Sequence, residues 1–144
     1  HDCMVGNHVI LANNATMAGH VVIGDHVVVG GLSAVHQFVR IGDFAMIGGM
    51  SGVESDVIPY GLVMGERASL AGLNLVGMKR NNISREEIHA LRNFYKLIFN
   101  NEDQTSFVER ANKIAVEFAD KQTVKIVADF INSETSRSFC QPKN

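Results

Sequence analysis

The sequence contains no tryptophan and only two cysteines and two prolines in 144 residues. Cys3 and Cys140 stand near opposite ends of the chain and fit no metal-ligand spacing, so we expect free thiols in a reducing, intracellular setting. No run of about 18 apolar residues is present, and no charged stretch precedes an apolar one, so a transmembrane helix and a secretory signal are not expected. These absences favour a cytoplasmic protein.

An excess of charge of one sign is also absent, because 13 Lys and Arg stand against 15 Asp and Glu. A broad nucleic-acid-binding face is therefore not expected, and any basic site must be local. The length fits one domain, or a repeat array with an appendage. The first residue is His1 and not methionine, so we expect the sequence to begin inside a fold.

A six-residue repeat occupies the chain up to Val57. Its aliphatic column consists of Val5, Leu11, Met17, Ile23, Val29, Val35, Ile41, Ile47 and Val53. A period of six does not stay on one face of an α-helix, and the segment is rich in Gly and β-branched residues, which are poor helix formers. Hexapeptide repeats indicate a parallel β-helix. With three strands in each coil, residues 18 apart stack about 4.8 Å from one another.

The third position of each unit is rich in Gly, Asn and Asp, as at Asn7, Gly19 and Asp25. These residue types tolerate positive φ or bond their own backbone, so we expect them to form the corners between strands.

The repeat fails after Val57, and three segments are expected. Residues 1–60 form the β-helix, 61–83 a loop or an irregular last coil, and 84–144 a C-terminal α-helical domain. Ser84 and Glu87 have the spacing of a capping box, which places the start of the first helix. The helices can cover the open end of the β-helix, where a bare sheet edge invites aggregation. The polar tail from Ser133 onward is expected to fray.

The 18-residue stacking rule gathers polar residues at one edge. It aligns His1 with Gly19 and Gln37, and it aligns Asp2 with His20 and Phe38 in the next column. An imidazole can take a proton, a neighbouring carboxylate can orient it, and a glycine N–H can face an oxyanion. The alternative is a set of ordinary exposed corner residues, which for any single histidine is the more frequent case.

Two further groups have simpler interpretations. His8 and His26 stack by the same rule on another column, and we expect them to be solvated surface residues. Lys79 and Arg80 precede the first expected helix, where they can meet a phosphate or an acidic partner, or remain solvated.

Several strings have a specific likeness. His1-Asp2-Cys3, the run from Asn13 to His20, the string from Ala34 to Phe38 and Gly77-Met78-Lys79-Arg80 resemble the UDP-N-acetylglucosamine O-acyltransferases that open lipid A biosynthesis. The resemblance implies a left-handed β-helix, a homotrimer with active sites between subunits, and further coils before His1. It also implies transfer of an (R)-3-hydroxyacyl group from acyl carrier protein to the glucosamine 3-hydroxyl of UDP-N-acetylglucosamine.

The resemblance assigns roles to individual residues. His1 corresponds to the general base, Asp2 to its orienting carboxylate, and the Gly19 N–H to the oxyanion donor. Gly49 corresponds to the position that limits acyl-chain length, and a glycine there implies a longer chain. The implied contacts to substrate are His20, His36, Gln37, Asn74 and Arg80. No metal and no bound cofactor are expected, because the thioester arrives already activated.

Other functions remain open at this point. A related hexapeptide-repeat enzyme could transfer an acyl group to an amine of a glucosamine substrate. A zinc-dependent carbonic anhydrase would need a third histidine suitably spaced from His20 and His36, and none is evident. A non-catalytic scaffold would not bind a UDP-sugar, so calorimetry separates it from the enzymes.

Overall fold

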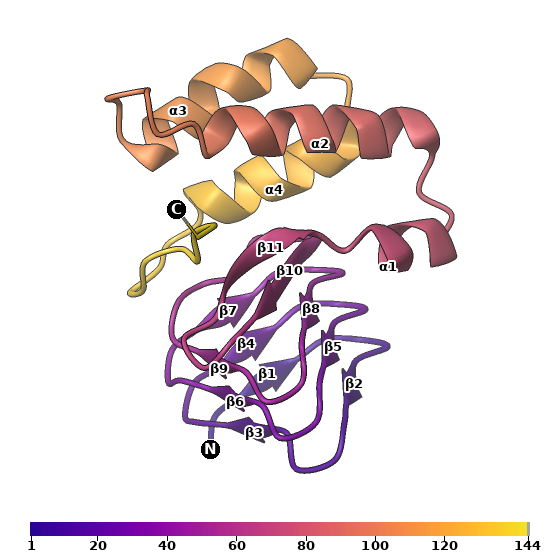
Figure 1. Ribbon diagram of the computed structural model, residues 1–144, viewed down its shortest axis with the longest axis vertical. Helices are drawn as coiled ribbons and strands as arrows, with labels where there is room; N and C mark the ends of the chain where they lie inside the picture. The colour runs from indigo at the N-terminus through magenta and orange to yellow at the C-terminus, as the bar shows by residue number, and fades with distance from the viewer. Residues whose placement is uncertain (144) are drawn as a thin grey trace.

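The six-residue repeat forms the coils of a parallel β-helix in the computed structural model, which describes residues 1–143 (Figure 1). Asn144, the last residue of the expected helical segment, lies outside the described residues. The three faces of the β-helix are formed by the strands β1-β4-β7, β2-β5-β8 and β3-β6-β9, and the second of these sheets is extended by two further strands beyond β8. Their strands are β1 (Met4–Val5), β2 (Ile10–Leu11), β3 (Thr16–Met17), β4 (Val22–Ile23), β5 (Val28–Val29), β6 (Ala34–Val35), β7 (Arg40–Ile41), β8 (Met46–Ile47) and β9 (Gly52–Val53).

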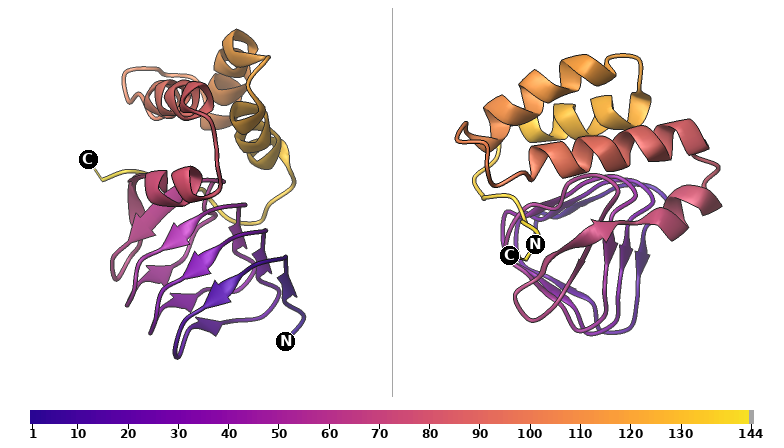
Figure 2. Two further views of the ribbon diagram at one scale, coloured as in Figure 1. Left: turned by 90° about the vertical axis from the view of Figure 1, so that its right-hand side faces the viewer. Right: turned by 45° about the horizontal axis from the view of Figure 1, so that its top comes forward.

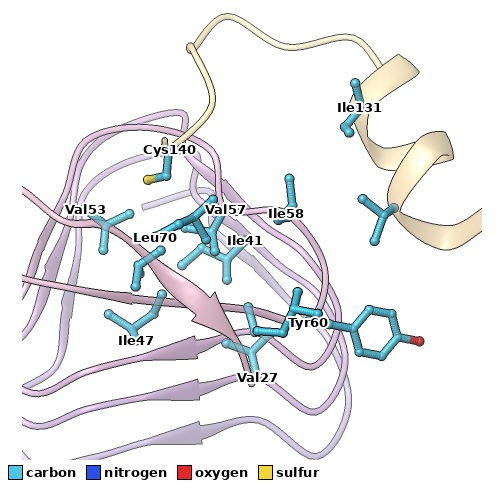
Figure 3. Close-up of a cluster of buried hydrophobic side chains, with 14 of the residues drawn as sticks. Val27, Ile41, Ile47, Val53, Val57, Ile58, Tyr60, Leu70, Ile131 and Cys140 are labelled. Atoms are coloured by element: carbon cyan, nitrogen blue, oxygen red, sulfur yellow. The ribbon is translucent and has the colours of Figure 1, made fainter. Parts of the chain in front are cut away.

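The expected 18-residue register is confirmed. Val5 pairs with Ile23, and Ile23 pairs with Ile41, in parallel strands. The aliphatic column fills the interior, and its members from Ile23 to Val53 are at most 2% exposed (Figure 3). Val5 and Leu11 remain 46% and 43% exposed because they lie at the open end of the first coil.

The corners differ from expectation in one respect. Positive φ belongs to the fourth residue of each unit, such as His8, His26 and Phe44, and not to the Gly, Asn or Asp at the third position. The physical reason is a hydrogen-bond ladder between coils. The N–H of His26 donates to the carbonyl of Asn7 at 2.8 Å, while the side chain of Asp25 accepts from the N–H of Asn7 at 2.7 Å.

The last coil is shorter than the others. Strand β10 (Gly61–Met64) pairs with β8 so that Leu62 lies opposite Met46, 16 residues away in place of 18. Strand β11 (Ser69–Leu73) pairs antiparallel with β10, and helix α1 (Leu75–Arg80) follows. Residues 61–83, which we expected to be a loop or an irregular coil, therefore contain two strands and a short helix.

Three longer helices lie over this last coil: α2 (Arg85–Ile98), α3 (Phe107–Ala115, continued by the 3-10 turn η1, Val116–Phe118) and α4 (Gln122–Asn132) (Figures 1 and 2). The Ser84 hydroxyl caps α2 as expected by accepting from the Glu87 N–H at 3.2 Å. None of the helices in residues 1–143 combines the length and the apolar character that crossing a membrane requires.

A buried ion pair joins the helices to the β-helix. Asp56 is fully buried and accepts hydrogen bonds from the backbone N–H of Arg40 at 2.9 Å and from its Nε at 3.0 Å. The Arg40 guanidinium lies 4.1 Å from the ring centroid of Phe130 in α4 and donates to the Phe130 carbonyl. Because this Asp is paired and bonded, its charge is compensated in the interior.

The expectation of a frayed tail is wrong. After α4 the chain returns along the β-helix, where the Thr135 hydroxyl donates to Asp56 and Phe139 forms a parallel bridge with Asp56. Cys140 is 3% exposed and packs into the core (Figure 3). The tail is ordered because its backbone groups pair with the last coil, which its polar composition does not reveal.

Candidate active site

The polar residues aligned by the stacking rule meet at the corner that follows strand β3. Asp2, His20 and Phe38 hold the positive-φ position of three successive coils, with φ of 58°, 61° and 64°. Their side chains therefore leave the β-helix in the same direction. His1 precedes Asp2, and its Nδ1 lies 2.7 Å from Asp2 Oδ2. This contact fixes one ring nitrogen of His1 and leaves Nε2 for other chemistry.

His20 lies near the same carboxylate oxygen and beside the His1 ring. Its Nε2 is 4.0 Å from Asp2 Oδ2, and its ring meets the His1 ring edge-on at a centroid distance of 5.2 Å. The His20 ring also stacks on the Phe38 ring at 4.9 Å between centroids, with an interplanar angle of 4°. The side chains of His1 and Asp2 are 75% and 67% exposed, so the cluster is open to a substrate.

Gly19 lies directly against the His1 ring. A Cβ at this position would be 2.7 Å from both Cε1 and Nε2 of His1, so only glycine lets the ring lie here. Among residues 1–143, no acceptor takes the Gly19 N–H. In this arrangement the His1 imidazole can accept a proton from a substrate, and the Gly19 N–H can stabilise an anion beside it.

His36 and Gln37 extend this corner into the third coil, and both are exposed. The Gln37 carbonyl accepts from Arg137 Nε at 3.1 Å, so the C-terminal tail holds the corner. Beside His36 a shallow hollow of about 310 Å³ opens on the β3-β6-β9 face. It is lined by Thr16, Ala18, Ala34, Val35, His36, Gly52, Val53 and Glu54.

The remaining sequence-predicted residues lie at other corners. Asn74 Nδ2 donates to the Phe44 carbonyl at 2.9 Å, and its Oδ1 accepts from the Gly77 N–H at 3.0 Å, capping α1. Gly49 follows β8, at the opposite end of the β3-β6-β9 face from His36. In one chain the structure therefore brings together His1, Asp2, Gly19, His20, His36 and Gln37, but not Asn74, Arg80 or Gly49.

Arg80 ends α1 and is exposed, close in sequence to a basic hollow between α1 and α2. That hollow measures about 470 Å³ and is lined by Lys79, Arg85, Glu86, Ile88, His89 and Arg92. Three of its six lining residues are Lys or Arg, so it suits an acidic or phosphorylated partner.

The stack of His8 and His26 expected from the sequence continues into a longer ladder of rings, at the corner between β7 and β8. His8, His26, Phe44 and Tyr60 stack in succession at 4.8, 4.7 and 5.2 Å between centroids. His8 and His26 are thus part of a stack, and the 18-residue rule already aligns them with Phe44. Burial, and then the charge of Asp43, raises the pKa of Tyr60 to about 12, so this phenol stays protonated and is no acid–base candidate.

One group of side chains in residues 1–143 has the donor types and spacing for a metal ion. It consists of His1, Asp2 and His20, whose ligand atoms lie within 4.8 Å of one another. Neither Cys3, whose thiol donates to the Ala18 carbonyl at 3.2 Å, nor buried Cys140 belongs to it.

Known proteins match this chain along its length. A family model described as UDP N-acetylglucosamine O-acyltransferase, domain 2, matches residues 56–140. The acyl-(acyl-carrier-protein)–UDP-N-acetylglucosamine O-acyltransferase of Caulobacter vibrioides is 57% identical over 143 residues, and that of Paracoccus denitrificans is 54% identical over 142. The matches cover 99% of this chain but only 54% and 52% of those proteins, so the chain spans about half the length of these curated relatives.

Solved structures agree with the fold. The UDP-N-acetylglucosamine acyltransferase of Campylobacter jejuni matches 99% of this chain and 54% of its own, with a TM-score of 0.89 and 43% identity. The Arabidopsis UDP-N-acetylglucosamine acyltransferase matches 98% and 51%, with a TM-score of 0.91 and 40% identity. These similarities confirm the expected left-handed parallel β-helix with a helical C-terminal segment.

Proposed function

Because the chain belongs to the UDP-N-acetylglucosamine O-acyltransferase family, we propose that it moves an (R)-3-hydroxyacyl group from acyl carrier protein to the glucosamine 3-hydroxyl of UDP-N-acetylglucosamine, the first step of lipid A biosynthesis. The proposal is supported by the His1–Asp2 contact of 2.7 Å beside the Gly19 N–H, which has no acceptor among residues 1–143. This is the set of groups that acyl transfer to a hydroxyl requires.

The reaction follows from the positions of these groups. Asp2 holds His1 Nδ1 protonated, so Nε2 accepts the proton of the sugar 3-hydroxyl. The sugar oxygen attacks the thioester carbonyl carbon, and the Gly19 N–H stabilises the resulting oxyanion. The C–S bond then breaks, the ester C–O bond remains, and the proton on His1 passes to the departing thiolate of the carrier.

The acyl chain has a matching surface. The hollow on the β3-β6-β9 face adjoins His36, and Gly49 lies at the far end of the same face. A Cβ at Gly49 would make only an ordinary contact, at 3.4 Å from the Gly31 carbonyl oxygen. A larger side chain would therefore extend outward into the path of the chain, and glycine leaves room for a longer one.

A homotrimer explains the separation of the predicted residues. Asn74 caps the start of α1 and bonds the Phe44 carbonyl, and Arg80 ends α1. Helix α1 lies on one side of the β-helix and the N-terminus on another (Figure 1). Packing the corner of one subunit against the side of another would unite both groups in one cleft between subunits. The basic hollow at Lys79 and Arg85 would then face the acidic carrier protein or its phosphopantetheine arm. The two free cysteines fit a cytoplasmic location.

The test is product formation by the complete protein that carries this chain. Incubated with UDP-N-acetylglucosamine and a 3-hydroxyacyl carrier protein, it should yield a sugar nucleotide heavier by one hydroxyacyl group, detected by mass spectrometry. Mild alkali should release the acyl group, because the product is an ester. An alkali-stable product would indicate an N-acyltransferase, and neither product nor calorimetric binding of the UDP-sugar would indicate a scaffold.

A further inference from the structure

We propose that His1, Asp2 and His20 form a binding site for a divalent transition-metal ion such as Zn²⁺, and that an ion bound there inhibits acyl transfer. The site would be regulatory or inhibitory and not a cofactor site. The binding half of this proposal depends only on the geometry of the corner. The inhibitory half rests on the proposed function of His1.

The donor set is the first reason. The corner offers two imidazole nitrogens and one carboxylate oxygen, all within 4.8 Å of one another. Zinc binds these groups in proteins, and three protein ligands with a water molecule are the usual arrangement of an open zinc site. Two histidines with one carboxylate also suit other first-row metals.

The distances are the second reason. Zinc bonds nitrogen and oxygen at about 2.0–2.2 Å, so two ligands of one tetrahedral ion lie about 3.3–3.5 Å apart. His1 Nδ1 is 2.7 Å from Asp2 Oδ2, and His20 Nε2 is 4.0 Å from the same oxygen. These two distances bracket the required one, and the ligand atoms of all three residues lie within 4.8 Å of one another. Because the side chains are exposed, rotations about their χ angles can bring the three atoms to the separation that one ion requires.

The fold holds these ligands in place, which is the third reason. The His20 N–H donates to the His1 carbonyl at 3.1 Å and fixes the two coils in register. The His1 ring lies against Gly19, and the His20 ring stacks on Phe38. Supports of this kind orient metal ligands and raise affinity.

A second histidine pair provides a matched control. His8 and His26 stack nearly parallel at 4.8 Å between centroids, at another corner of the same coils. Within residues 1–143 they belong to no group of three close His, Cys, Asp or Glu ligands. They differ from the proposed site in lacking the third ligand.

Inhibition follows from a change in the protonation of the His1 ring. An ion on His1 Nδ1 and Asp2 replaces the contact that orients the base. Because Nδ1 then binds the metal, the ring proton of neutral His1 stands on Nε2, which can no longer accept the substrate proton. Imidazole binds metals only in its neutral form, so binding and inhibition should both weaken as the pH is lowered.

Binding is tested on untagged, metal-free protein. Cobalt(II) absorption reports coordination, and calorimetry with ZnCl₂ gives stoichiometry and affinity. We expect one ion per chain, and His20→Ala or Asp2→Asn should weaken binding by about 10-fold or more, whereas His8→Ala should not. Equal affinity in the native chain and His20→Ala, with circular dichroism unchanged in both, would overturn the site.

Inhibition is tested in the complete protein by titrating Zn²⁺ into the transfer assay and reversing it with a chelator. Native protein and His8→Ala should lose the same fraction of activity at the same Zn²⁺ concentration. His20→Ala should need a Zn²⁺ concentration about 10-fold higher to lose the same fraction of its own activity. Stoichiometric binding without inhibition would overturn the inhibitory half. Absence of transfer in metal-free protein would instead contradict the proposed function and leave the binding result standing.

Discussion

At the scale of single residues, the candidate site depends on the absence of one side chain. The His1 ring occupies the space where a Cβ of residue 19 would lie, and this position also keeps His1 within 2.7 Å of Asp2. Gly19 therefore leaves room for the His1 ring, in addition to the role of N–H donor that we propose for it. The sequence predicted the donor role, whereas the need for room became evident only from the packing of neighbouring coils.

Gly19→Ala should accordingly lower acyl transfer by displacing His1. A misplacement of about 1 Å can cost about 100-fold in rate, and we expect a fall of that order in kcat. Because His1 is exposed and can rotate away, the thermal unfolding midpoint should change little. An unchanged kcat would show that His1 does not act from the observed position.

Asn74 supports a different prediction, because both ends of its side chain already hold the fold. Asn74→Ala removes the bond to the Phe44 carbonyl and the cap of α1, so it should destabilise the protein by about 1–2 kcal/mol in urea unfolding. Unchanged stability with a raised KM for the UDP-sugar would instead favour the substrate contact implied by the family resemblance.

At the scale of elements, Glu87 links two helices. Its N–H is capped by Ser84, but its carboxylate reaches α4 and accepts from the N–H groups of Gln122 at 2.8 Å and Thr123 at 3.0 Å. Only half of the predicted capping box thus forms. Helix α4 has no side-chain cap of its own, and Glu87 of α2 supplies the missing acceptor.

This contact predicts a dependence of stability on pH. Burial acts to raise the pKa of Glu87, but the hydrogen bonds from Thr123 and Gln122 outweigh it, and the pKa lies below its ordinary 4.5. A lowered pKa means that the ionised carboxylate stabilises the fold above pH 4.5 and loses this effect as the pH falls further. Glu87→Gln should thus have a lower free energy of unfolding than the native protein at neutral pH, and this difference should shrink as the pH falls below 4.5.

Urea unfolding at several pH values measures this difference. Glu86→Gln is the matched control, because it makes the same change of charge at an exposed neighbour in the same helical turn. A difference between Glu87→Gln and native protein that stays constant down to low pH would contradict the role of the Glu87 carboxylate.

Elements differ in how far sequence alone specified them. The column from Val5 to Val53 predicted the short strands of the β-helix and their 18-residue pairing register, because a six-residue repeat can be recognised from neighbouring residues alone. The pairing of β10 with β11 was not foreseen, since residues 61–73 lack alternation and are rich in Gly and Ala. The docked tail was missed because its partners are far away in sequence, such as Gln37 for Arg137.

At the scale of the whole molecule, the helical segment and tail close one end of the β-helix, while the first coil stays open at the other (Figure 2). His1 lies at one corner of the β-helix, whereas Asn74 and Arg80 lie at another. The 18-residue rule aligns residues along one corner, so it could not predict how residues at different corners form one cleft. Their separation in one chain is the structural reason for proposing a trimer.

We propose that His1, oriented by Asp2, is the base of an acyl transfer to a sugar hydroxyl. The most direct measurement compares hydroxyacyl transfer by the complete native protein, His1→Ala and His8→Ala, at equal content of folded, assembled protein. If His1 is the base, His1→Ala should lower the transfer rate by about 100- to 10,000-fold, and His8→Ala should leave it unchanged. Near-native transfer by His1→Ala would contradict this proposal.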